Sequence, residues 1–103
     1  MRFYRKLYVS AGVADPALTK WRLRHHSVRL SLYVLRLTED RGSVEILHNL
    51  FLERRPEKPV YIIGLAASKT DAVRLYADIV KEALEHTGSP DVVRYLFPHG
   101  IRE

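Results

Sequence analysis

Residues 60–72 read VYIIGLAASKTDA, and this stretch predicts the junction between a buried strand and the longest helix of the chain. Its first half is apolar at every position, which is typical of an interior strand covered on both faces. Ser68 and Asp71 then have the spacing of a helix N-terminal cap, in which side-chain oxygens accept from free backbone amides. We expect the helix to run from about Lys69 to His86 and to end at Gly88.

The same residues resemble a phosphate-binding loop, but the glycine spacing of that loop is missing. The loop needs a glycine, four residues of any kind, and then Gly-Lys-Ser/Thr. Ile63 and Ser68 occupy the two glycine positions, and Asp71 would repel a phosphate at the helix start. We therefore interpret the junction as structural. Ser68, Lys69 and Thr70 remain candidates for a weak anion site, because the free amides of a helix start attract anions.

Outward from this junction, β-prone and alternating residues predict three further strands. They cover residues 3–9, 28–37 and 44–54. The sequence TEDRGS predicts a hairpin turn between the second and third of these strands. Gly64, inside the interior strand, predicts a bulge or a close approach to a helix.

One more helix and one ambiguous segment complete the predicted elements. Asp15–Pro16 is a strong helix start, so a helix should run from there to about His26. Residues 91–97, DVVRYLF, follow a helix-start signal but are rich in β-prone side chains. Helix and strand both stay open for this segment, and its side chains favour a strand.

These elements predict a single α+β domain over residues 1–103, in the order β-α-β-β-β-α plus a short C-terminal element. The economical packing is a mostly antiparallel sheet of four to five strands with two helices on one face. The other face would then expose apolar side chains, namely Tyr33, Leu35, Leu47 and Phe51. Such a face suggests a partner surface, most simply that of a homodimer. The alternative is that the tail FPHGIRE or the ambiguous segment covers it.

Positive charge is concentrated near the N-terminus. Residues 1–37 hold eight of the 17 Lys and Arg residues but only one of the 12 acidic residues. Within KWRLRHHSVR, residues 20–29, arginines flank an aromatic ring, an arrangement in which cations bind phosphates while a base stacks. The candidate polyanion-binding residues are Lys20, Arg22, Arg24 and Arg29. We expect Trp21 to lie in the core, because it shares a helix face with Leu18. The alternative for the cations is an ordinary solvated surface.

His48 is the one histidine that the pattern places on an apolar strand face. It is therefore a candidate buried titratable group. The usual role of such a residue is that of a hydrogen-bonded core histidine, and the alternatives are a catalytic base or a pH-sensitive switch. The chain has no cysteine, and no His or carboxylate spacing suits a metal, so we expect no metal and no cofactor.

No apolar run approaches the roughly 20 residues of a membrane-spanning helix. The N-terminal apolar stretch is short and interrupted by Ser10 and Gly12, so we interpret it as a strand and not as a signal peptide. We expect a cytoplasmic protein without membrane contact.

The segment VYIIGLAASKTDAVRLYADIVKEALEHTG, with KLYVS near the start, resembles a group of small uncharacterised bacterial proteins. The shared pattern is a strand ending in Gly-x-Ala and a long helix closing with Thr-Gly. The resemblance implies a small bacterial α+β protein and carries no activity. The leading hypothesis is therefore a non-catalytic, homodimeric interaction module. The alternatives are a nucleic-acid-binding protein that uses the basic N-terminal third and a small enzyme with a site around His48.

Overall fold

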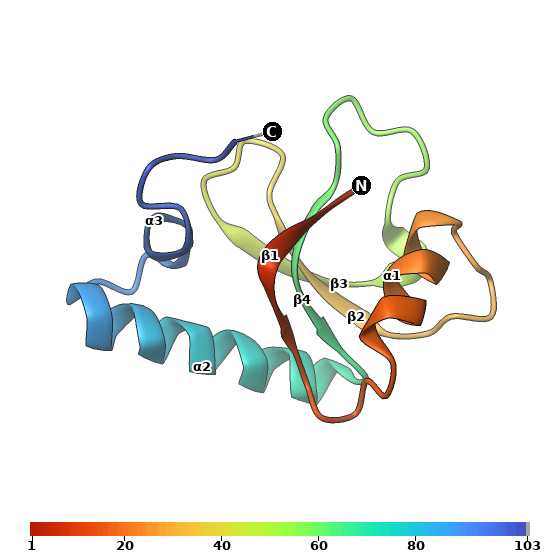
Figure 1. Ribbon diagram of the computed structural model, residues 1–103, viewed down its shortest axis with the longest axis horizontal. Coiled ribbons are helices and arrows are strands. Elements are labelled where there is room, and N and C mark those ends of the chain that lie inside the picture. The colour runs from red at the N-terminus through yellow and green to blue at the C-terminus, as the bar shows by residue number, and fades with distance from the viewer. Residues whose placement is uncertain (103) are drawn as a thin grey trace.

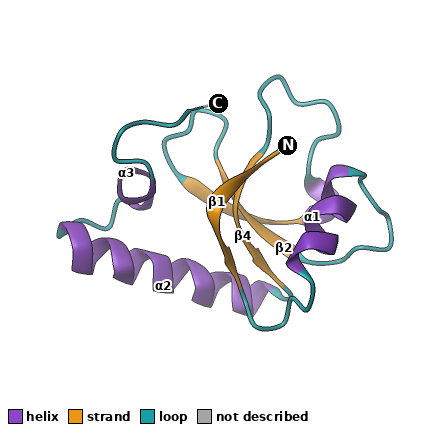
Figure 2. Ribbon diagram, in the orientation of Figure 1, coloured by secondary structure: helices purple, strands orange, loops and turns teal. Residues whose placement is uncertain are grey.

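The computed structural model describes residues 1–102, so Glu103, the last residue of the predicted domain, lies outside the described residues. The described chain contains a four-stranded sheet in the spatial order β1-β4-β2-β3. Its strands are β1 (Arg2–Val9), β2 (Tyr33–Leu37), β3 (Val44–His48) and β4 (Tyr61–Ala66). The helices are α1 (Pro16–Arg24), α2 (Lys69–Thr87) and α3 (Val92–Leu96), with a 3-10 helix, η1, at Asn49–Phe51. The predicted α+β class is confirmed (Figure 2).

The sheet is mixed, whereas the sequence predicted a mostly antiparallel one. β2 is antiparallel to both of its neighbours, but β1 runs parallel to β4. A parallel pair needs a long crossover connection, and here everything between residues 10 and 60 supplies it. The element order also differs from the predicted one, by η1 after the third strand and by a helix as the last element.

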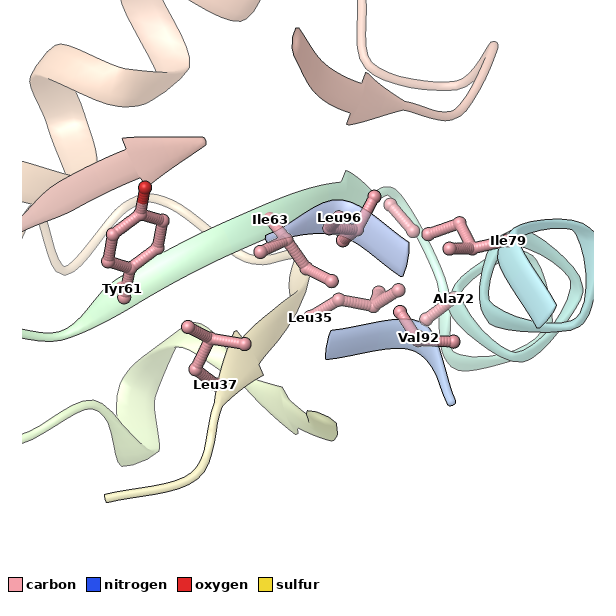
Figure 3. Close-up of a cluster of buried hydrophobic side chains, with 9 residues drawn as sticks. Leu35, Leu37, Tyr61, Ile63, Ala72, Ile79, Val92 and Leu96 are labelled. Atoms are coloured by element: carbon pink, nitrogen blue, oxygen red, sulfur yellow. The ribbon is translucent and has the colours of Figure 1, made fainter. Parts of the chain in front are cut away.

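The helices cover both faces of the sheet, so the prediction of two helices on one face is wrong (Figure 1). On one face, Leu23 of α1 packs in a cluster with sheet residues such as Val34 and Ile62. On the other, α2 and α3 pack over a second cluster, drawn in Figure 3, that includes Leu35 and Ile63. Apart from Arg36, successive residues of β2 and β4 are apolar or aromatic, so both faces of these two strands have to be covered.

The surface predicted for a homodimer does not exist as one face. Tyr33 and Leu35 point to the α2 side, where Leu35 is fully buried, while Leu47 packs on the α1 side. Phe51 lies in η1 and is 76% exposed. The reason is the register, which pairs Leu35 with Ile46 and therefore gives those two residues a common face.

Two predicted strands are shorter than expected. Asn49 follows the end of β3, and its side chain binds the backbone of the segment that precedes β2. The expected strand 28–37 begins only at Tyr33, and the expected strand 44–54 ends at His48. The side-chain oxygen of Asn49 accepts from the Leu32 N–H at 2.9 Å, and its amide nitrogen donates to the Leu30 carbonyl at 3.0 Å. These bonds hold residues 30–32 beside η1 without a strand ladder.

Residues 92–96 form a helix, so the preference for a strand in this segment is wrong. Asp91 caps α3 by accepting a hydrogen bond from the Arg94 N–H at 3.2 Å. Val92 and Leu96, four residues apart, face the core beneath the helix. Burial of this pair outweighs the β-propensity of the individual side chains.

The junction of β4 and α2 has the predicted geometry. Ser68 Oγ accepts from the Asp71 N–H at 3.1 Å, and Gly88 ends α2 with a left-handed φ of 74°. The pairing of β2 with β4 shifts register beside Gly64, where a methyl group would lie 3.2 Å from Leu75 Cδ2. Both expectations for this glycine, the irregular strand and the close approach of a helix, are confirmed. Within residues 1–102, no helix combines the length and apolarity needed to cross a membrane.

Candidate nucleic-acid interface

Helix α1 begins and ends at local signals that fix how it leaves the sheet. Asp15 accepts from the Leu18 N–H at 3.0 Å, and Pro16 occupies the first helical position, as predicted. After Arg24 the helix stops, and His26 takes a left-handed φ of 47° that turns the chain sharply. The exposed helix therefore runs for nine residues, with a turn of basic and aromatic residues at its end.

Trp21 lies on the outer ridge of α1 and is 57% exposed, so the prediction that it is a core residue is wrong. The buried residues of α1 are Thr19 and Leu23. Trp21 is two positions from each, and at about 100° per residue this places it nearly opposite the buried side. The face that it shares with Leu18 is therefore the face turned away from the sheet.

His25 stacks on Trp21 and makes a two-ring platform. The ring centroids are 4.1 Å apart, with 24° between the ring planes. His25 Nδ1 lies 2.7 Å from the Trp21 carbonyl oxygen. Since a carbonyl can only accept, Nδ1 carries the proton, and the histidine ring is held in place by this bond. One face of the indole is thus covered by a fixed partner.

Three cations of α1 flank the Trp21 ridge on both sides. Lys20 and Arg24 lie on one flank, where Lys20 Nζ is 5.7 Å and Arg24 Cζ 4.8 Å from the centroid of the Phe3 ring. These cation–π contacts orient the two side chains along β1. Arg22 is exposed on the opposite flank, about 100° around the helix from Trp21. The structure therefore places an outward aromatic ring between positive charges.

A cavity of about 310 Å³ opens beside the C-terminal end of α1. Arg24, His26 and Arg54 line it, together with Met1 and one acidic residue, Glu53. These side chains come from the chain start, the end of α1 and the loop before β4, so only the tertiary structure brings them together. Sequence reasoning missed His25, His26 and Arg54. The spacing of four residues between Trp21 and His25, which suits a ring pair on one helix face, was the one available signal.

Arg29 lies apart from the helix, in the exposed loop that leads from α1 toward β2. The four predicted polyanion-binding residues thus divide into three on α1 and one on the following loop. The candidate anion site lies elsewhere: Ser68, Lys69 and Thr70 are exposed at the start of α2. Asp71 is half-buried beside them, which puts a negative charge next to the free amides.

His48 is half-buried at the end of β3, where it caps η1. Its Nδ1 accepts from the Leu50 N–H at 3.2 Å, and its Nε2 lies 2.9 Å from Ser31 Oγ. Because Nδ1 accepts, the proton of the neutral ring is on Nε2, which donates to Ser31. A histidine that donates to a serine does not take that serine's proton, so this pair lacks the arrangement of a Ser-His nucleophile.

Comparison of the chain with protein-family models, with curated proteins and with solved structures returned no match. The resemblance of residues 60–88 to small uncharacterised bacterial proteins stays a prediction from the sequence. The geometry of α1 is therefore the ground on which a function can be argued.

Proposed function

We propose that this protein is a small non-catalytic binding module whose ligand is a nucleic acid and whose binding surface is helix α1. The observation that carries the proposal is Trp21, exposed on the outer ridge of α1 with Arg22 on one flank and Lys20 and Arg24 on the other. Nucleic acids present phosphates and flat bases side by side, and this ridge offers a partner for each.

The charge of the whole chain supports the same ligand. The formal net charge is +5, with the excess in the N-terminal third that contains α1. A positive surface raises the local concentration of a polyanion and speeds its association. Guanidinium groups also bind phosphate oxygens through paired N–H donors, which lysine cannot do as well.

The proposal predicts binding that depends strongly on salt, measured by fluorescence anisotropy with labelled DNA and RNA of about 12 nucleotides. Neutralising the α1 cations, in the variant K20Q/R22Q/R24Q, should weaken binding at low salt at least about tenfold and flatten the slope against log salt. The matched control is R74Q/K81Q/R94Q, which removes the same charge from exposed positions on α2 and α3.

The control variant should bind nearly as well as the wild type. Equal losses in both triple variants would mean that net charge alone attracts the ligand, and the proposed surface would be wrong. The absence of binding to any DNA or RNA in dilute buffer would end the proposal.

Homodimerisation and a cytoplasmic location stay predictions from the sequence. The homodimer prediction rested on an exposed sheet face that includes Leu35, and Leu35 is buried inside one subunit. Nucleic-acid binding by α1 does not require a dimer, because the basic side chains and the ring all belong to one chain.

A further inference from the structure

We propose that the nucleic acid is single-stranded, with an unpaired base stacked on Trp21 and an adjacent backbone phosphate bound in the cavity lined by Arg24, His26 and Arg54. This inference rests on the proposed function and adds the strand state of the ligand and a second set of contacts. The single-stranded state and the additional contacts are inferred from three structural features, which binding by charge alone would not require.

The first feature is the free surface of the indole. His25 covers one ring face of Trp21, and the side chain is still 57% exposed, so a ligand can reach the other face and the ring edge. Ala17 lies one helical turn before Trp21, and its single methyl group is too small to cover the second ring face. A base in a duplex is already stacked on both sides, whereas an unpaired base has a free face to offer.

The second feature is that the platform is fixed before any ligand arrives. The bond from His25 Nδ1 to the Trp21 carbonyl and the ring stack restrict both side chains. Binding to a restricted ring costs less conformational entropy than binding to a mobile one. An outward tryptophan held in this way is suited to stacking with a base. An ordinary solvated basic surface would not need an ordered aromatic ring.

The third feature is the position of the cavity relative to the ring. Arg24 is three residues after Trp21, so the two side chains are neighbours on the helix surface. The left-handed turn at His26 directs the chain so that Arg24 and His26 line the same cavity of about 310 Å³. Arg54 joins them from the loop before β4, which gives the cavity two guanidinium groups against one carboxylate, Glu53. A phosphate next to a stacked base is the group that fits this chemistry.

The alternative occupant of such a ridge is an anionic membrane surface, since Leu18 is exposed beside Trp21. Interfacial helices present a broad apolar face opposite a charged one. Here Lys20 and Arg24 lie on one side of the ridge and Arg22 on the other, so the exposed apolar side chains of α1, Leu18 and Trp21, stand among cations. The charge pattern therefore favours a nucleic-acid strand that lies between the cations, and not a flat membrane surface.

The experiment uses the intrinsic fluorescence of the whole chain, in which Trp21 is the only tryptophan. Oligo(dT) and oligo(rU) of about 12 nucleotides are titrated beside a DNA duplex of equal length and an abasic DNA strand. We expect both single strands to quench Trp21, and the DNA and RNA arms show which of the two is preferred. The abasic strand should bind about 5- to 150-fold more weakly than oligo(dT), without quenching.

Variants separate the ring from the cavity. W21A, followed by anisotropy, should lose the advantage of oligo(dT) over the abasic strand, while W21F should keep part of it. R54Q should lower the slope of log K against log salt by about 0.7, the value for one phosphate contact on a single strand. R55Q removes the same charge from the adjacent exposed residue, which does not line the cavity, and should leave the slope unchanged.

Equal affinity for duplex and single strand, without quenching of Trp21, overturns this inference and leaves the proposed function standing. Failure to bind any of the four probes ends both. A blue shift of Trp21 emission with anionic phosphatidylserine vesicles, together with no quenching by the oligonucleotides, overturns the inference in favour of a membrane surface.

Discussion

Asn49 supplies hydrogen-bond partners to buried backbone groups beside the core cluster beneath α1. It is buried, and its side chain supplies both a donor and an acceptor to the backbone of residues 30–32. Its own N–H donates to the Leu32 carbonyl at 3.0 Å. Leu30 and Leu32 can therefore contribute to the core although they precede the strand.

Replacing Asn49 by alanine should lower the free energy of unfolding by about 2–6 kcal/mol. The variant leaves the Leu32 N–H and the Leu30 carbonyl in the interior without their side-chain partners, and each such group costs about 1–3 kcal/mol. Urea denaturation measures the loss. Leu50→Ala, at the neighbouring position that is 63% exposed, is the control and should change stability by less than about 0.5 kcal/mol. Equal values for the two variants would contradict the role given to Asn49.

At the scale of the elements, the nine-residue helix α1 depends on its cap more than the 19-residue helix α2 does. A helix of nine residues has few internal hydrogen bonds to offset the entropy of its first turn. The Asp15 side chain binds the Leu18 N–H, and Thr19 Oγ1 donates to the Asp15 carbonyl at 2.8 Å. The same residues position Trp21, so the cap supports the binding surface as well as the fold.

Asp15→Ala should cost about 1 kcal/mol of stability, because the Leu18 N–H loses its acceptor. Asp15→Asn keeps an oxygen at the same place and should stay within about 0.5 kcal/mol of the wild type. Denaturation followed by the fluorescence of Trp21, which is on this helix, measures both. If alanine and asparagine prove equally destabilising, the lost charge and not the lost cap is responsible.

Across the whole molecule, a hydrogen bond ties the N-terminal strand to the longest helix. Tyr8 of β1 donates to Glu82 Oε2 of α2 at 2.6 Å. Burial, and then this hydrogen bond, raise the pKa of Tyr8 well above its ordinary value. Burial also raises the pKa of the neighbouring Tyr4 and Tyr95. The contact favours a neutral tyrosine and connects the edge strand β1 to α2.

This linkage predicts a loss of stability at high pH. Since the pKa of Tyr8 is higher in the folded than in the unfolded chain, its stabilising effect is complete below the unfolded value of about 10 and disappears as the pH rises through the folded value. Urea denaturation between about pH 8 and about pH 11 should show a falling free energy of unfolding. Tyr8→Phe should be less stable at the lower pH and should fall less steeply. Parallel curves for the two proteins would contradict the linkage.

The candidate site could be predicted only in part, and the residues show why. Lys20, Arg22 and Arg24 could be found from their charge and spacing, because neighbours on a helix are also neighbours in sequence. The sequence predicts a buried Trp21, because an apolar helix face is usually the buried one. In α1 the buried side is set by Thr19 and Leu23. Arg54 could not be connected with Arg24, since 30 residues of chain and two strands separate them.

The sequence alone determined the features that depend on a few neighbouring residues: the caps at Asp15 and Ser68, the end of α2 at Gly88, and the α+β class. The caps and the helix end form from hydrogen bonds and backbone preferences within about one helical turn, and the class follows from the helix and strand patterns of single segments. The tertiary structure decided the parallel pairing of β1 with β4, the helices on both faces of the sheet and the outward position of Trp21. Strands that are apolar on both faces do not specify which helix covers which face. That choice is made by packing between residues far apart in the chain.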